Sequence, residues 1–122
     1  MLKEIILVAL GGALGSSLRY GCTLGVDHLA WHPTIATLIV NVLGSFLIGM
    51  VISSSDKPTF TLFASVGFCG GFTTFSTFSS QNVRLLQQSL YGQAFAYMGS
   101  TLVLCFLATW IGIMLGQRIH NA

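Results

Sequence analysis

Long apolar stretches separated by short polar ones dominate the pattern along the chain. Hydrophobic residues fill most positions of four segments, which we place at 5–26, 34–52, 59–90 and 95–115. A helix needs about 20 mostly apolar residues to cross a bilayer, and each segment has roughly that length or more. The pattern therefore predicts an all-α membrane protein in which four transmembrane helices form a single domain over residues 1–122.

Short polar or turn-forming stretches separate these segments. His32 and Pro33 indicate a turn, with the proline near the start of the second helix. Residues 53–58 are polar, end in proline and are the clearest loop in the sequence. Tyr91 and Gly92 predict a further turn before the last helix.

The third segment combines glycines, hydroxyl residues and phenylalanines as no other segment does. Because of this mixture, we expect its helix to break near 70–76 and helical character to return around Asn82–Leu90. Broken backbone at membrane depth is tolerated only where protein or a water-filled cavity satisfies the freed N–H and C=O groups. The break therefore indicates a binding site or a pore.

Composition and charge argue against several classes of protein. Of the residues, 53% are hydrophobic and only 7% are charged, too few for the surface of a water-soluble domain. The formal net charge of +2 is too small and too scattered for a nucleic-acid-binding patch. The three carboxylates lie near segment ends and the three cysteines lie far apart, so we predict neither an enzyme nor a side-chain metal site.

The distribution of positive charge bears on orientation in the membrane. Four crossings would place both termini on one side, together with Lys3, Lys57 and Arg118. Arg84, and to a lesser degree Arg19, would oppose them, so the positive-inside bias is weak. A weak bias permits insertion in both orientations and would allow two copies to pair antiparallel.

Arg19 is the one charged residue well inside a predicted helix. It shares a face with Gly11 and Gly15 at four-residue spacing, and such small residues let a second helix approach closely. A cation inside a membrane segment costs about 2.5–3.5 kcal/mol on insertion scales. We therefore expect Arg19 either to act as a structural cation, by pairing with backbone carbonyls or by reaching the membrane interface, or to attract anions into a vestibule.

Polar stripes run along the second and fourth segments. Asn41 and Ser45 are one helical turn apart, and Thr101, Cys105 and Thr109 repeat every four residues. A neutral amide can donate two hydrogen bonds, which suits an anion that must shed water and still leave. Hydrogen bonding between helices is the alternative for Asn41, and threonines in membrane helices often bond to carbonyls of their own helix.

Phe75 and Phe78 are three residues apart, so a helix would carry both rings on one face. The edge of an aromatic ring is electropositive. A ring turned edge-on to a pore could therefore attract a small anion without holding it as strongly as a full charge. Ordinary apolar packing is the alternative for each ring.

Residues 67–79, Gly-Phe-Cys-Gly-Gly-Phe-Thr-Thr-Phe-Ser-Thr-Phe-Ser, closely resemble the signature of the Fluc/CrcB fluoride channels. Residues 11–20 and 41–49 resemble that family as well. The resemblance covers essentially the whole chain in length, order of motifs and number of spans. Many family members carry a carboxylate where this chain has Gln81 and Asn82.

The resemblance implies a fluoride-selective channel that lets fluoride leave the cell passively across a bacterial-type cytoplasmic (inner) membrane and so confers fluoride resistance. It implies an antiparallel, dual-topology homodimer with two pores, each lined by both subunits, and a structural sodium ion at the dimer centre. The backbone carbonyls of Gly70 and Thr73 would hold this ion, and Arg19 would lie in a vestibule. The fluoride pore would be lined by Asn41, Ser45, Phe75, Thr77, Phe78, Gln81, Thr101, Cys105 and Thr109.

Two other classes of protein remain as alternatives. A small dual-topology multidrug or cation exporter would also use about four short spans, but such coupled exporters generally need a carboxylate within the membrane. A non-transporting membrane assembly subunit would use the glycine faces and hydroxyl stripes for packing alone.

Overall fold

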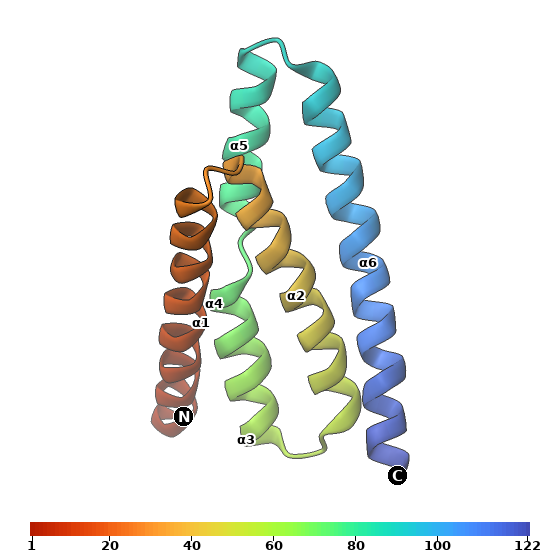
Figure 1. Ribbon diagram of the computed structural model, residues 1–122. Helices are drawn as coiled ribbons and strands as arrows, with labels where there is room; N and C mark the ends of the chain where they lie inside the picture. Colours follow the sequence, from red (N-terminus) through yellow and green to blue (C-terminus); the bar gives the residue numbers. More distant parts are fainter.

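The computed structural model describes residues 1–122 and is helical throughout, with no strand (Figure 1). Three uninterrupted helices are long and apolar enough to cross a membrane: α1 (Leu2–His28), α2 (Pro33–Ser54) and α6 (Tyr91–Asn121). The remaining stretch consists of four shorter pieces: α3 (Pro58–Thr61), the π-helix η1 (Leu62–Cys69), α4 (Gly70–Phe72) and α5 (Phe75–Gln87). The prediction of an all-helical membrane protein is confirmed.

Two predicted boundaries are wrong. Helical geometry returns at Phe75 and not around Asn82, because the Thr74 hydroxyl accepts a hydrogen bond from the Thr77 N–H and caps α5. The turn before α6 falls at Gln88–Leu90, and Tyr91 is already helical. Within that turn the Leu90 N–H donates to the Leu85 carbonyl, which closes the end of α5.

The helices form two packed pairs, and both chain termini lie at the lower end of the molecule in Figure 1. On one side α1 packs against η1 and α4, and on the other α2 packs against α6. At the opposite end α5 packs against α6, and Phe78 and Leu85 form a buried cluster there with Ala94 and Tyr97. The break between α4 and α5 therefore lies near the middle of the bundle.

Glycines bring α1 and the broken segment into backbone contact. A Cβ atom at Gly11 would collide with the Phe63 carbonyl oxygen, and one at Gly15 with that of Phe68. A Cβ at Gly71 would lie 2.6 Å from the Gly12 carbonyl oxygen. The glycine face predicted on the first segment is thus a helix-packing surface.

A second glycine contact, which we did not predict, joins α2 to α6. A Cβ at Gly112 would collide with the Phe46 carbonyl oxygen, and one at Gly49 with that of Thr109. In lipid, where apolar burial does not drive association, such close approach supplies the packing energy between helices.

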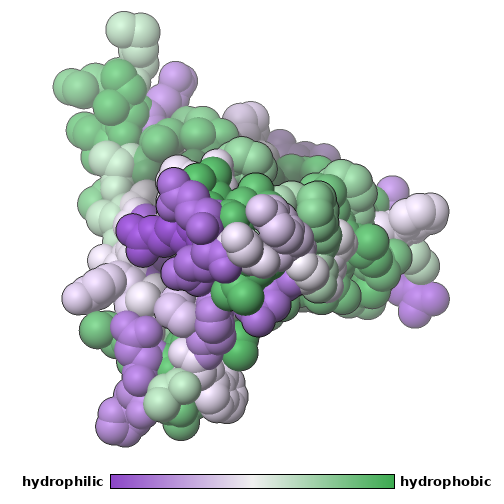
Figure 2. Space-filling view, turned by 90° about the horizontal axis from the view of Figure 1, so that it is seen from above, coloured by the Kyte–Doolittle hydropathy of each residue, from purple (hydrophilic) through white to green (hydrophobic).

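Most large apolar side chains point outward. Only 21 of 122 residues are buried, whereas Phe106 and Trp110 on α6 are 72% and 67% exposed. Seen from above, hydrophilic residues gather mainly at the near end of the bundle and hydrophobic ones on its flanks (Figure 2). This distribution is expected for a chain whose flanks face lipid or another copy rather than water.

Candidate functional site

The chain leaves helical geometry at Thr73 and Thr74, within the interval in which the sequence predicts a break. Both residues are extended, with φ and ψ of −85° and 158° at Thr73 and −150° and 114° at Thr74. Two extended residues between helices free backbone donors and acceptors that a continuous helix would satisfy. Where those groups find partners determines what the break can do.

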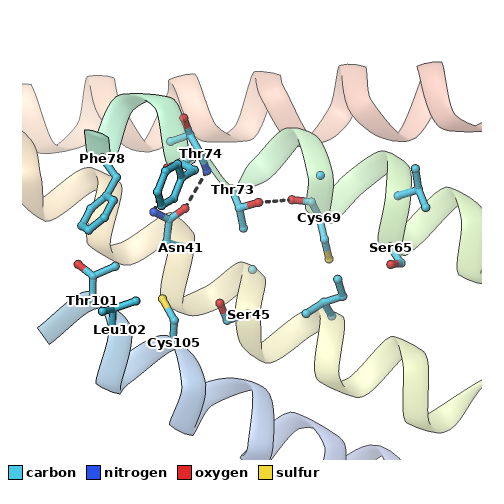
Figure 3. Close-up of a pocket in the computed structure, with 15 residues that line it drawn as sticks. Asn41, Ser45, Ser65, Cys69, Thr73, Thr74, Phe78, Thr101, Leu102 and Cys105 are labelled. Carbon is cyan, nitrogen blue, oxygen red and sulfur yellow. Dashed lines mark hydrogen bonds between the residues drawn. The ribbon is translucent and has the colours of Figure 1, made fainter. Parts of the chain in front are cut away.

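The side-chain amide of Asn41 supplies partners for both backbone groups of Thr74. Its Nδ2 donates to the Thr74 carbonyl at 3.1 Å. Its Oδ1 accepts from the Thr74 N–H at 2.8 Å (Figure 3). The amide therefore pairs with the open backbone as a peptide group in a neighbouring strand would. Hydrogen bonding between helices, the alternative considered for Asn41, is present, and one of its two amide N–H groups remains free.

These bonds leave two carbonyls of the break without their helical donors. The Thr74 N–H, which would donate to the Gly70 carbonyl in a continuous helix, donates to Asn41 instead. The Thr77 N–H donates to the Thr74 hydroxyl, and the Thr73 carbonyl accepts no backbone hydrogen bond. Gly70 and Thr73 thus offer main-chain oxygens that a hard cation could use.

Thr73 is itself anchored to the preceding helical turn. Both its N–H and its hydroxyl donate to the Cys69 carbonyl, at 3.0 and 2.8 Å. Its hydroxyl is therefore occupied, and the carbonyl is the polar group of Thr73 that stays available. Cys69, Gly70 and Thr73 all line the cavity described next.

An open cavity of about 500 Å³ lies between α2, η1 and α6, next to the break (Figure 3). It brings together eight of the residues singled out from the sequence: Asn41, Ser45, Gly70, Thr73, Phe75, Phe78, Thr101 and Cys105. Its wall also includes Gly44, Ser65 and Cys69, which the sequence did not single out. The wall is mostly apolar, with amide and hydroxyl groups and no charged side chain.

The two phenylalanines differ in environment. The Phe78 side chain is buried and packs edge-on against the Tyr97 ring, with centroids 5.0 Å apart and planes at 66°. Phe75 is 76% exposed, and its ring lies 5.6 Å from that of Phe78. Phe78 therefore has a fixed orientation within this chain, whereas Phe75 projects beyond it.

Thr101 has a buried hydroxyl with no hydrogen-bond partner at the wall of the cavity. An unsatisfied buried polar group costs about 1–3 kcal/mol. The Asn82 side-chain carbonyl is also unpartnered, although its amide donates to the Phe78 carbonyl at 2.9 Å. The Thr101 hydroxyl is thus a buried donor beside the cavity that has no acceptor within the chain.

Four predicted site residues lie outside the main cavity. Arg19 and Thr77 line a second, small cavity of about 30 Å³ behind the break. The Thr109 hydroxyl donates to the Ser45 carbonyl at 3.1 Å, and Gln81 accepts from the Tyr97 hydroxyl at 2.7 Å. Thr109 and Gln81 therefore contact groups that border the site and do not line either cavity.

Arg19 pairs with the backbone of the broken segment, one of the two roles expected for it. Its Nε donates to the Gly71 carbonyl at 3.0 Å, and the Ser16 hydroxyl reaches the same oxygen at 3.5 Å. Gly71 lies in the last turn before the break, where carbonyls lack helical donors and a cation is favourable. Arg19 is half-buried, and its terminal nitrogens make no hydrogen bond within the chain.

No three histidine, cysteine, aspartate or glutamate side chains gather anywhere in the structure. A cation at this site would therefore rely on main-chain oxygens. The η1 segment has no sequence signal that we recognised, although π-helical turns often occur at functional sites.

Comparison with known proteins adds a second line of argument. The family model described as CrcB-like protein, Camphor Resistance (CrcB), matches residues 6–113. A protein of Listeria monocytogenes serotype 4b named fluoride-specific ion channel FluC 1 is 42% identical, over 95% of this chain and 99% of its own length. Proteins named fluoride-specific ion channel FluC from Gloeothece citriformis and Serratia proteamaculans are 44% and 39% identical, over 94% and 99% of this chain and 98% and 99% of their own lengths.

Proposed function

The chain belongs to the CrcB family, and from this membership we propose that it is a fluoride-selective ion channel through which fluoride leaves the cell passively. Relatives similar over nearly their whole length are named as fluoride-specific channels, not as enzymes. The observation that carries the proposal is the cavity beside the break, where uncharged donors and aromatic rings converge.

The chemistry of the cavity suits a small anion in transit. Asn41 keeps one free amide N–H, and the buried Thr101 hydroxyl lacks an acceptor. Fluoride is a strong acceptor that could take both donors and replace part of its lost hydration. Because neither donor is charged, the ion is not held as tightly as it would be by a cation, and it can move on.

Phe75 and Phe78 supply ring edges along the same path. Phe78 is fixed by its edge-on contact with Tyr97, whereas the 76% exposed ring of Phe75 lacks a neighbour on its outer side. A second copy packed antiparallel on this open face would cover Phe75 and close the cavity. The proposed unit is thus a dual-topology homodimer with two pores, each lined by both subunits.

The other polar residues would extend the path or support it. Ser45 on α2 and Cys105 on α6 both line the cavity. Thr109 and Gln81 would position their hydrogen-bonded neighbours, Ser45 and Tyr97. Selectivity against chloride would come from a pore too narrow for the larger ion.

Arg19 and Thr77 would form the approach to the pore. They line the small cavity behind the break together with further threonines. The terminal nitrogens of Arg19 make no bond within the chain, so they could raise the local concentration of anions while Nε holds the Gly71 carbonyl.

A structural sodium ion at the centre of the dimer fits the donors of the break. The Gly70 and Thr73 carbonyls lack their helical partners, and carbonyl oxygens are suitable ligands for a hard monovalent cation. In an antiparallel dimer the same two carbonyls would come from each copy. These residues would hold the ion, which would supply positive charge where four carbonyl dipoles meet.

Passive export through such a channel places the protein in a bacterial-type cytoplasmic (inner) membrane, with the apolar flanks against lipid. Efflux from liposomes loaded with potassium fluoride tests the proposal. The channel predicts rapid fluoride release at equal pH on both sides, and only after valinomycin provides a path for the compensating charge. Release without valinomycin would indicate proton-coupled transport, and no release from folded protein would favour an assembly subunit.

A further inference from the structure

We propose that Gly44 on α2 is a positioning residue for the break, because its missing side chain leaves the recess that receives the Thr73 methyl group. The recess fixes Thr73 and so aims its free carbonyl. The consequence for sodium rests on the function proposed above, whereas the contact between Gly44 and Thr73 does not.

The close approach at Gly44 is to a side chain, unlike the backbone contacts of the helix-packing glycines. A Cβ at Gly44 would collide with Thr73 Cγ2, and the next nearest side-chain neighbour is Phe72 Cδ2 at 3.5 Å. At Gly99 on α6, by comparison, a Cβ would meet nothing within 4 Å. Gly44 is therefore a close-fitting recess for one methyl group.

Thr73 cannot turn its methyl group away from Gly44 without losing another contact. Its hydroxyl donates to the Cys69 carbonyl at 2.8 Å, which fixes the side-chain rotamer. Rotation about the Cα–Cβ bond is already restricted in a β-branched residue. The N–H of Thr73 donates to the same carbonyl at 3.0 Å and holds the backbone from that side.

One face of α2 thus holds both extended residues. Gly44 follows Asn41 by three residues and lies on the same face; Asn41 pairs with Thr74, and Gly44 receives Thr73. The Thr73 carbonyl accepts no backbone hydrogen bond. Its direction is therefore set by these contacts of its own residue and of Thr74.

The substitution Gly44→Ala forces Thr73 to move and should turn its carbonyl away from the sodium position. Over-packing of this kind usually costs enough to change an equilibrium about tenfold or more. We expect the sodium concentration that gives half-maximal fluoride efflux to rise by about that factor. The variant Gly99→Ala adds the same methyl group at an open position and should leave it unchanged.

A second substitution separates positioning from a general loss of packing. Thr73→Ser removes the colliding methyl group and keeps the hydroxyl bond to Cys69. The double variant Gly44→Ala with Thr73→Ser should recover the sodium dependence of the parent. A double variant that stays as impaired as Gly44→Ala, although it folds and forms dimers, would overturn the proposal.

Thermal unfolding of the parent, Gly44→Ala, Thr73→Ser and the double variant, measured with choline in place of sodium, keeps this inference distinct from the function. If neither the Tm nor the fluoride efflux of the parent differs between sodium and choline, the proposed sodium site is contradicted. The recess still predicts that Gly44→Ala lowers Tm and that adding Thr73→Ser restores most of it. Independent, additive losses of Tm in the double variant would contradict the recess itself.

Discussion

Asn41 and Thr74 form a reciprocal pair in which one side-chain amide satisfies both open backbone groups of a broken membrane helix, with bonds of 3.1 and 2.8 Å. The pair explains how extended backbone is tolerated at this depth, since each group would otherwise lack a partner. It also orients the remaining amide N–H of Asn41, a residue that lines the cavity. The ion-binding role proposed for Asn41 therefore falls on the same side chain that holds the break.

The substitution Asn41→Asp tests the pair. The carboxylate keeps an acceptor for the Thr74 N–H but loses the donor and faces the Thr74 carbonyl with negative charge. We expect the free energy of unfolding to fall by about 1–3 kcal/mol and fluoride efflux to be suppressed. Asn121→Asp, at the exposed end of α6, is the matched control. Unchanged stability in Asn41→Asp would mean that the pair does not hold the break.

Phe75→Ile and Phe78→Ile should separate packing from conduction. Phe78 is buried against Tyr97, so its replacement should lower both stability and fluoride efflux. Phe75 is 76% exposed within the chain, so its replacement should change the free energy of unfolding of the single chain by less than about 0.5 kcal/mol. The same replacement should suppress fluoride efflux, because it removes a proposed ring edge of the pore. Phe106→Ile, on the outer surface of α6, should do neither. Normal efflux in both Phe75→Ile and Phe78→Ile would mean that the ring edges play no part in fluoride conduction.

Thr101→Val should raise stability and lower activity together. The hydroxyl is buried without a partner, so its removal relieves an unsatisfied group and should stabilise the protein by about 1 kcal/mol. If that hydroxyl donates to passing fluoride, efflux should fall about tenfold, the loss of one hydrogen bond of this size. Thr109→Val, which removes a bond to Ser45, should instead be mildly destabilising. A Thr101→Val protein with full efflux would show that the hydroxyl plays no part.

Arg19→Lys and Arg19→Gln test the cation that α1 places beside the end of α4. Both lose the Nε bond to the Gly71 carbonyl, worth about 1.5–3 kcal/mol for a charged donor. Lysine retains the charge that favours the carbonyl end of a helix, so Arg19→Lys should be the more stable of the two in thermal unfolding. Equal stability in all three proteins would assign Arg19 to anion attraction alone.

The sequence predicted those features that depend on the residue types present. The glycine and threonine content of the third segment indicated the break, and the cost of a cation within the membrane indicated a carbonyl partner as one of the roles open to Arg19. The predicted end of the break lies too late in the sequence. The glycines just before the break favour irregular backbone, but the Thr74 side chain caps α5 and starts this helix at Phe75.

Features that depend on local backbone geometry or on a contact with another element could not be predicted. Asn41 gives no sign in the sequence that its partners are main-chain groups of Thr74, 33 residues away. The π-helical turns of η1 leave no pattern of side chains, and Gly44 is one of 14 glycines until its neighbour Thr73 is known. The residue types alone reveal none of these features.

In the proposed function, this cavity conducts fluoride and excludes chloride. The most direct test of this proposal is the reversal potential of the purified protein in a planar bilayer, with unequal sodium fluoride concentrations on the two sides and an opposite gradient of sodium chloride. A fluoride-selective pore should give discrete currents that disappear when fluoride is removed and reverse at a potential set by the fluoride gradient alone. Currents that persist in chloride, or a reversal potential that follows the chloride gradient, would contradict it.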